Sequence, residues 1–120
     1  MISDEVLRLI IAIFFGSLGL LHFIYGRIME KYAVEGGLLN AEVAVKMSGA
    51  LLITSSIALF IEKYVEYGYY GLCLFLVLSS LILHKFWSRS TGVEQLMELL
   101  HFLKNLLLAA LIWYLKDHLN

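Results

Sequence analysis

Four long apolar stretches, separated by short polar segments, set the hydrophobic pattern of the chain. They cover residues 6–25, 43–61, 67–87 and 96–115. Each is close to the length of about 20 residues that an α-helix needs to cross the hydrocarbon core of a bilayer. A strand of a membrane β-barrel needs only about 9–11 residues and shows strict alternation, which these stretches lack. The pattern therefore predicts an all-α protein with four membrane-spanning helices.

The connections between the stretches are short and predict a single domain, residues 1–120. Residues 26–42 read as a long first loop, with room for an amphipathic turn, and residues 62–68 as a tight second turn. Residues 88–94 form the third connection and contain residues able to start the fourth helix. Because helices joined in this way run in alternating directions, we expect a membrane-embedded up-down four-helix bundle with both termini on one side.

The composition agrees with a membrane protein. Hydrophobic residues make up 61% of the chain and charged residues 16%, whereas a soluble domain has about 45–50% and about 25%. We therefore expect a multi-pass protein of the cell membrane, surrounded by the lipid bilayer. The net charge of -1 gives no basic surface for nucleic acid. The single cysteine, Cys73, excludes an intrachain disulfide framework.

Polar residues gather at one end of the apolar stretches. His22 lies near the end of the first stretch, Lys46 near the start of the second and His84 near the end of the third. The fourth stretch opens with Glu98, His101, Lys104 and Asn105. Since successive spans cross in opposite directions, all of these residues are expected at similar depth on one side of the membrane. Ionisable groups at membrane depth are costly and usually face the bundle interior, where they often mark function.

Helical spacing predicts which faces of the spans point inward. In the first stretch, small residues that favour close helix contact share a face with His22; they are Ala12, Gly16, Gly19 and Gly26. In the third, one face carries Cys73, Val77, Ser80, His84 and Trp87. In the fourth, one face carries Glu94, Glu98, His101 and Asn105. These faces would place three histidines around one cavity, with Trp87 and Phe102 in its wall.

Several kinds of site are compatible with this cluster. A metal needs three or four ligands in tight geometry, and the single ExxH pair of Glu98 and His101 lacks the second copy found in di-metal bundles. Haem needs two facing axial ligands. A quinone needs an apolar slot and a few hydrogen-bond donors, and it fits the residue inventory best. In a purely structural alternative, Glu98 and His101 pair and the lysines reach toward the headgroups.

The last two stretches resemble a known family. The sequence HKFW at residues 84–87 and the sequence HFLKNLLLAALIWYL at residues 101–115 are similar to the DoxX family of small four-helix membrane proteins. Three features depart from the family pattern: the segment GRIMEKY after the first stretch, the absence of proline, and Ala109-Ala110 in the fourth stretch, where the family commonly has glycine. The resemblance implies an integral membrane protein, often tied to redox enzymes or quinone chemistry.

Two functions follow as expectations. The first is a redox-associated subunit that takes a quinone or quinol head group in a histidine-lined cavity. Its binding residues would be His22, His84, Trp87, Glu98, His101, Lys104 and Asn105. Its partners would be a soluble or membrane redox enzyme subunit or a second copy of the chain, and whether it is itself an enzyme stays open. The second is a non-catalytic partner or assembly factor that docks other membrane proteins through its small-residue faces.

Overall fold

The structure of the chain is a computed structural model that describes residues 3–35, 37–82 and 92–118. Most of these residues are helical, and none of them belongs to a strand. The elements are α1 (Asp4–Ile24), α2 (Gly26–Glu35), α3 (Ala41–Phe60), the short 3-10 helix η1 (Glu62–Tyr64), α4 (Val65–Ile82) and α5 (Gly92–His118). The predicted all-α class is confirmed for the described part of the chain.

The predicted spans agree with the long helices to within a few residues at most ends. Residues 6–25 correspond to α1, residues 43–61 to α3, and residues 96–115 lie inside α5. By length and composition, α1, α3 and α5 are able to cross a membrane. The described helix α4 is also apolar but shorter, and residues 83–87 of the predicted third span lie outside the described residues.

The first connection differs from the prediction of a loop, because residues 26–35 form the helix α2. It follows α1 almost directly: the Tyr25 amide donates to the Leu21 carbonyl at 2.8 Å and closes α1. After α2 the chain turns at Gly37 (φ 92°) and Asn40 (φ 55°). Both adopt the left-handed backbone conformation that glycine and asparagine tolerate best.

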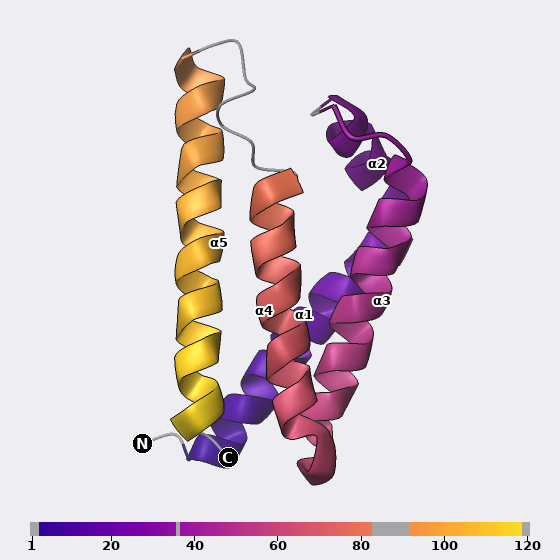
Figure 1. Cartoon of the computed structure of the whole chain (residues 1–120). Helices are drawn as coiled ribbons and strands as arrows, with labels where there is room; N and C mark the ends of the chain where they lie inside the picture. Colours follow the sequence, from indigo (N-terminus) through magenta and orange to yellow (C-terminus); the bar gives the residue numbers. More distant parts are fainter. Residues whose placement is uncertain (1–2, 36, 83–91, 119–120) are drawn as a thin grey trace.

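The long helices pack in sequence order, with alternating chain direction (Figure 1). Helix α1 packs on α3, α3 on α4, and α4 on α5, while α2 lies against α3 at the end away from the termini. The core runs through the middle of this arrangement, and its buried side chains are Ala12, Phe15, Leu52, Leu59, Val65, Tyr69, Leu72, Leu76, Ala109 and Ile112.

Glycine brings α1 and α3 into backbone contact. A Cβ atom added to Gly19 would lie 3.0 Å from the Gly49 carbonyl oxygen, and one added to Gly49 would lie 2.8 Å from the Cβ of His22. Ala12 and His22 are buried on the same side of α1. The prediction that this small-residue face meets a neighbouring helix is therefore confirmed for α1, although Gly26 belongs to α2.

Helices α4 and α5 are joined by side chains that donate to backbone carbonyls. The Cys73 Sγ atom donates to the Ala109 carbonyl oxygen and the Ser80 Oγ atom to the Phe102 carbonyl oxygen, each at 3.4 Å. The predicted inward face of the third span is therefore correct for Cys73 and Ser80. Val77 differs, since it is exposed. His84 and Trp87 lie outside the described residues.

Candidate functional site

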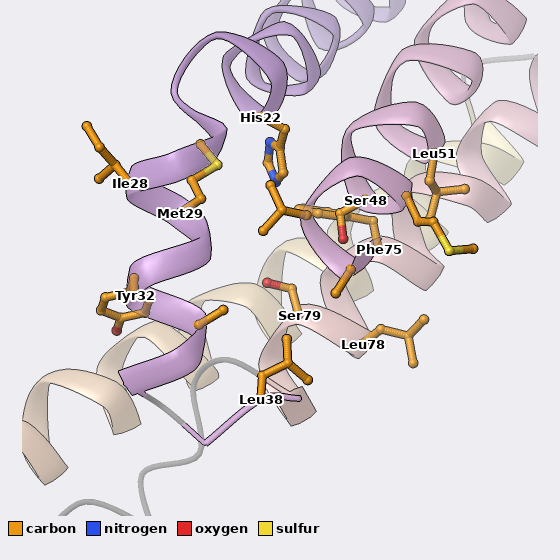
Figure 2. A pocket seen from close by; sticks show the side chains of 14 residues that line it. His22, Ile28, Met29, Tyr32, Leu38, Ser48, Leu51, Phe75, Leu78 and Ser79 are labelled. Carbon is orange, nitrogen blue, oxygen red and sulfur yellow. The ribbon is translucent and has the colours of Figure 1, made fainter. Parts of the chain in front are cut away.

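A cavity of about 570 Å³ lies between the end of α1, the helix α2, the first half of α3 and the second half of α4. Figure 2 shows the side chains that line it. Most are apolar: Ile28, Met29, Ala33, Leu38, Ala44, Val45, Met47, Leu51, Phe75 and Leu78. The polar ones are His22, Tyr32, Ser48 and Ser79. A mainly apolar cavity of a few hundred Å³ with a few polar groups is the usual form of a small-molecule site.

His22 is the buried titratable side chain of this cavity, with 9% of its surface exposed. Its Nδ1 atom lies 2.8 Å from the Leu18 carbonyl oxygen, one turn earlier on α1. Because a carbonyl oxygen only accepts, Nδ1 carries the hydrogen and donates it. In the neutral ring, Nε2 then has a free lone pair. The imidazole packs edge-on against Phe75, with ring centroids 5.9 Å apart, and points toward the middle of the cavity (Figure 2).

Tyr32 connects the cavity to the last helix. Its side chain lies on the cavity wall formed by α2, and its hydroxyl donates a hydrogen bond to the Glu98 carboxylate on α5. Glu98 is buried, with 7% of its surface exposed. A hydrogen bond to a charged, buried acceptor is among the stronger ones in proteins, so this contact holds α2 toward α5 beside the cavity.

A second cavity of about 460 Å³ adjoins the first and shares His22 and Val45 with it. It is polar, and its charged residues are Arg27 and Glu30 from α2 and Glu42 and Lys46 from α3. Lys46 and Glu42 form an ion pair at 2.7 Å between two exposed side chains. His22 therefore lies between an apolar cavity on one side and a charged cavity on the other.

The predicted site residues divide into four groups, the last of which is His101 and Lys104. His22 lines both cavities. Glu98 and Asn105 are buried on α5, as expected for an inward face, but in the described part of the chain only Glu98 reaches the apolar cavity, and it does so through Tyr32. His84 and Trp87 lie outside the described residues.

His101 and Lys104 depart from the predicted arrangement. Lys104 is exposed, and its Nζ atom lies 3.4 Å from the Nδ1 atom of the half-buried His101. Neither residue lines the described cavities, and Phe102 does not line them either. The reason is the packing order: α5 lies against α4, whereas the cavity is enclosed by α1, α2, α3 and α4. Among the described residues, no group of three His, Cys, Asp or Glu side chains is placed to hold a metal.

The sequence reasoning missed Tyr32, Ser48 and Ser79. Tyr32 lies in the predicted first loop. The spacing of Ile28, Met29, Tyr32 and Ala33 on one helical face is the signal in the sequence that indicates a helix there. The two serines carry no pattern of their own, because serine is common at helix contacts in membranes.

Comparison with known proteins gives no match: no family model, no curated protein and no solved structure matches the chain. The resemblance to the DoxX family therefore rests on residues 84–87 and 101–115, and the structure describes the second of these segments.

Proposed function

We propose that the protein is a DoxX-like multi-pass protein of the cell membrane, in which α1, α3, α4 and α5 form an up-down four-helix bundle. The apolar lengths of α1, α3 and α5 support this arrangement. Helix α4 has 18 residues, which at 1.5 Å per residue is about 27 Å and close to the thickness of a hydrocarbon core of about 30 Å. The alternating chain direction in Figure 1 also fits four crossings.

The crossing of α4 is tested by single cysteines placed on either side of the pair α4–α5. Lys63 precedes α4 and His118 ends α5. In a Cys73→Ser background, Lys63→Cys and His118→Cys should react with a membrane-impermeant maleimide from the same side of oriented vesicles. Labelling from opposite sides would mean that only one of the two helices crosses, which contradicts the four-span arrangement.

Within this bundle, the apolar cavity is the proposed site for a quinone or quinol head group. The observation that carries the proposal is the buried His22, which presents one hydrogen-bonding nitrogen to a cavity otherwise built mainly from apolar side chains. A flat ring with one or two oxygen atoms and an apolar tail matches such a lining. Bound there, a quinone and quinol pair supplies the ability to carry two electrons and two protons.

The chain's own residues have separate roles in holding such a head group. The neutral His22 ring accepts a hydrogen bond at Nε2, and the hydroxyls of Ser48 and Ser79 donate or accept. Phe75 provides an aromatic edge beside the imidazole. Glu98 acts indirectly, because it holds the Tyr32 hydroxyl at the cavity wall. A redox enzyme subunit or a second copy of this chain would exchange electrons with the bound head group.

Isothermal titration calorimetry tests the site. A short-tailed 1,4-benzoquinone is titrated into detergent-solubilised protein. We expect saturable binding by the wild type and at least about tenfold weaker binding by Ser48→Phe, whose ring would occupy the cavity. Thr54→Phe is the matched control, because Thr54 lies on the exposed side of the same helix. Absence of saturable binding, or equal binding by Ser48→Phe, would overturn the quinone site and leave the docking or assembly role.

A further inference from the structure

His22 lines both cavities and is therefore able to contact molecules in either of them. The apolar cavity and the charged cavity share the walls formed by His22 and Val45. The Val45 side chain has no titratable group. His22 is therefore the side chain shared by the two cavities that is able both to form a hydrogen bond and to change its protonation state.

The hydrogen bond to Leu18 fixes which nitrogen is available. Nδ1 donates to the Leu18 carbonyl oxygen whether the ring is neutral or protonated. The change in protonation therefore occurs at Nε2, which accepts a hydrogen bond in the neutral ring and donates one in the imidazolium. Imidazole is the side chain that commonly makes this change between pH 5 and 8.

The two oxidation states of a quinone differ in the same property. A hydroquinone has hydroxyl groups that donate and accept hydrogen bonds, whereas a benzoquinone has only carbonyl acceptors. A neutral His22 accepts a hydrogen bond from a hydroquinone hydroxyl at Nε2, but its Nε2 lone pair faces the lone pairs of a benzoquinone carbonyl. A protonated His22 satisfies either ligand. A buried acceptor that faces another acceptor loses its hydrogen bond and keeps the cost of desolvation.

We propose that the protonation state of His22 selects the oxidation state of the bound ligand, with the quinol favoured when the ring is neutral and this preference lost when the ring is protonated. The inference rests on the proposed quinone site. It makes His22 a specificity-determining residue whose preference between the two ligands follows its protonation at Nε2.

Charged side chains of both signs line the cavity beside His22. Helix α2 contributes Arg27 and Glu30, and α3 contributes Glu42 and Lys46, so the charged cavity holds two cations and two anions. Across the apolar cavity, the titratable group is Tyr32, and α4 faces the ring with Phe75. Polar and charged side chains of this kind suit water that carries protons.

The test compares the dissociation constants of a short-tailed 1,4-hydroquinone and the corresponding 1,4-benzoquinone, without oxygen, at pH 5.5 and pH 8.5. For the wild type, the ratio of the benzoquinone constant to the hydroquinone constant should fall by about five- to tenfold from pH 8.5 to pH 5.5, the value of one hydrogen bond. In His22→Gln the ratio should be the same at both pH values, because the amide both donates and accepts without titrating.

His118→Gln is the matched control. Its Nδ1 atom lies 2.8 Å from the Tyr114 carbonyl oxygen, which repeats the bond of His22, but the residue is exposed near the end of α5. This variant should keep the wild-type shift. If His22→Gln does not fold, calorimetry of the wild type in buffers of different ionisation enthalpy gives the same answer: between the two pH values benzoquinone binding should take up protons and hydroquinone binding should not.

The outcomes separate the two proposals. If neither ligand binds at either pH, the proposed function fails and the selection by His22 fails with it. If both ligands bind and the wild-type ratio does not change with pH, or the shift persists in His22→Gln, the proposed function stands and the selection by His22 is overturned.

Discussion

The contact between α1 and α3 and the contact between α4 and α5 use different means to join two apolar helices. In the first, Gly19 and Gly49 bring the backbones together. In the second, Cys73 and Ser80 reach across to carbonyl oxygens. The apolar cavity borders the glycine contact at His22, Val45 and Ser48, and the four predicted site residues of α5 line neither described cavity.

The difference shows how packing decides the role of a polar residue. A glycine contact is close at one point, and helices that cross there diverge beyond it, which leaves room beside the crossing. His22, one turn from Gly19, faces that room. On α5, by contrast, Glu98 and Asn105 are buried without lining either described cavity. Polar residues at similar depth are thus able to form a site in one region and a support in the other.

The largest effect is expected from enlarging the glycine contact. Gly49→Ala places a Cβ atom 2.8 Å from both the His22 Cβ and the Phe23 ring. Overpacking costs about 1–3 kcal/mol, and the better helix propensity of alanine returns up to about 1 kcal/mol. We therefore expect a net loss of about 2 kcal/mol in unfolding free energy, measured by thermal unfolding in detergent.

Gly26→Ala is the control for this prediction, because its nearest contact would be the Glu30 carboxylate at 3.9 Å. It should leave stability unchanged or raise it by up to about 1 kcal/mol. Equal stability losses in the two variants would show that the contact between α1 and α3 is not limited by space.

A smaller effect is expected from Tyr32→Phe, which removes the hydroxyl that joins the cavity wall to α5. Hydrogen bonds to charged groups contribute about 1.5–3 kcal/mol, and Tyr32 is partly exposed, so we expect about 1–2 kcal/mol. Hydrogen exchange of the α2 amides should become faster. Tyr67→Phe, on an exposed side chain at the start of α4, should not change it. Unchanged exchange in Tyr32→Phe would mean that α2 is held by its contacts with α3 and α1 and not by this hydrogen bond.

Cys73→Ser should change stability by less than about 0.5 kcal/mol, because a hydroxyl is able to donate to the Ala109 carbonyl in place of the thiol. Cys73→Ala removes the donor and leaves a small void, and it should cost about 1 kcal/mol. Thermal unfolding of the two variants side by side distinguishes a hydrogen-bonded contact from simple packing. Equal losses would show that the bond contributes nothing to the contact between α4 and α5.

Asn105→Leu should have the smallest effect. Asn105 is buried on α5, and its side chain forms no hydrogen bond with the residues that the structure describes. Replacing an unpaired buried amide by an apolar side chain of similar size is nearly neutral or stabilising. We expect a change within about 0.5 kcal/mol by thermal unfolding. A loss of about 0.6–2 kcal/mol, the range of a hydrogen bond between membrane helices, would instead show that the Asn105 amide forms an interhelical hydrogen bond.

The limits of sequence-based prediction can be located in particular residues. The long apolar runs predicted α1, α3 and α5, because a membrane requires a minimum length of apolar helix. The ten residues of α2 fall in a predicted loop, because a short helix of mixed polarity does not need the long apolar run that marks a membrane-spanning helix. Spacing also predicted that Glu98 and Asn105 are buried. It did not predict which helix lies opposite them, because one helix does not specify its neighbour.

The same reasoning explains the outcome for the histidines. Depth and helical face, both readable from the sequence, place His22 and His101 at the same level. Their surroundings depend on the order in which the helices pack, which puts α5 against α4 and away from α1. The hydrogen bond between Tyr32 and Glu98 joins residues 66 positions apart and has no local pattern.

That separation has a consequence for the synthesis of the protein. A ribosome adds about 5–20 residues per second, so Glu98 is made roughly 3–13 seconds after Tyr32, given the 66 positions between them. During this interval α2, α3 and α4 are completed, whereas the acceptor for the Tyr32 hydroxyl does not yet exist. The four elements that line the apolar cavity are therefore made before the last helix arrives, and the hydrogen bond that joins α2 to α5 forms only after them.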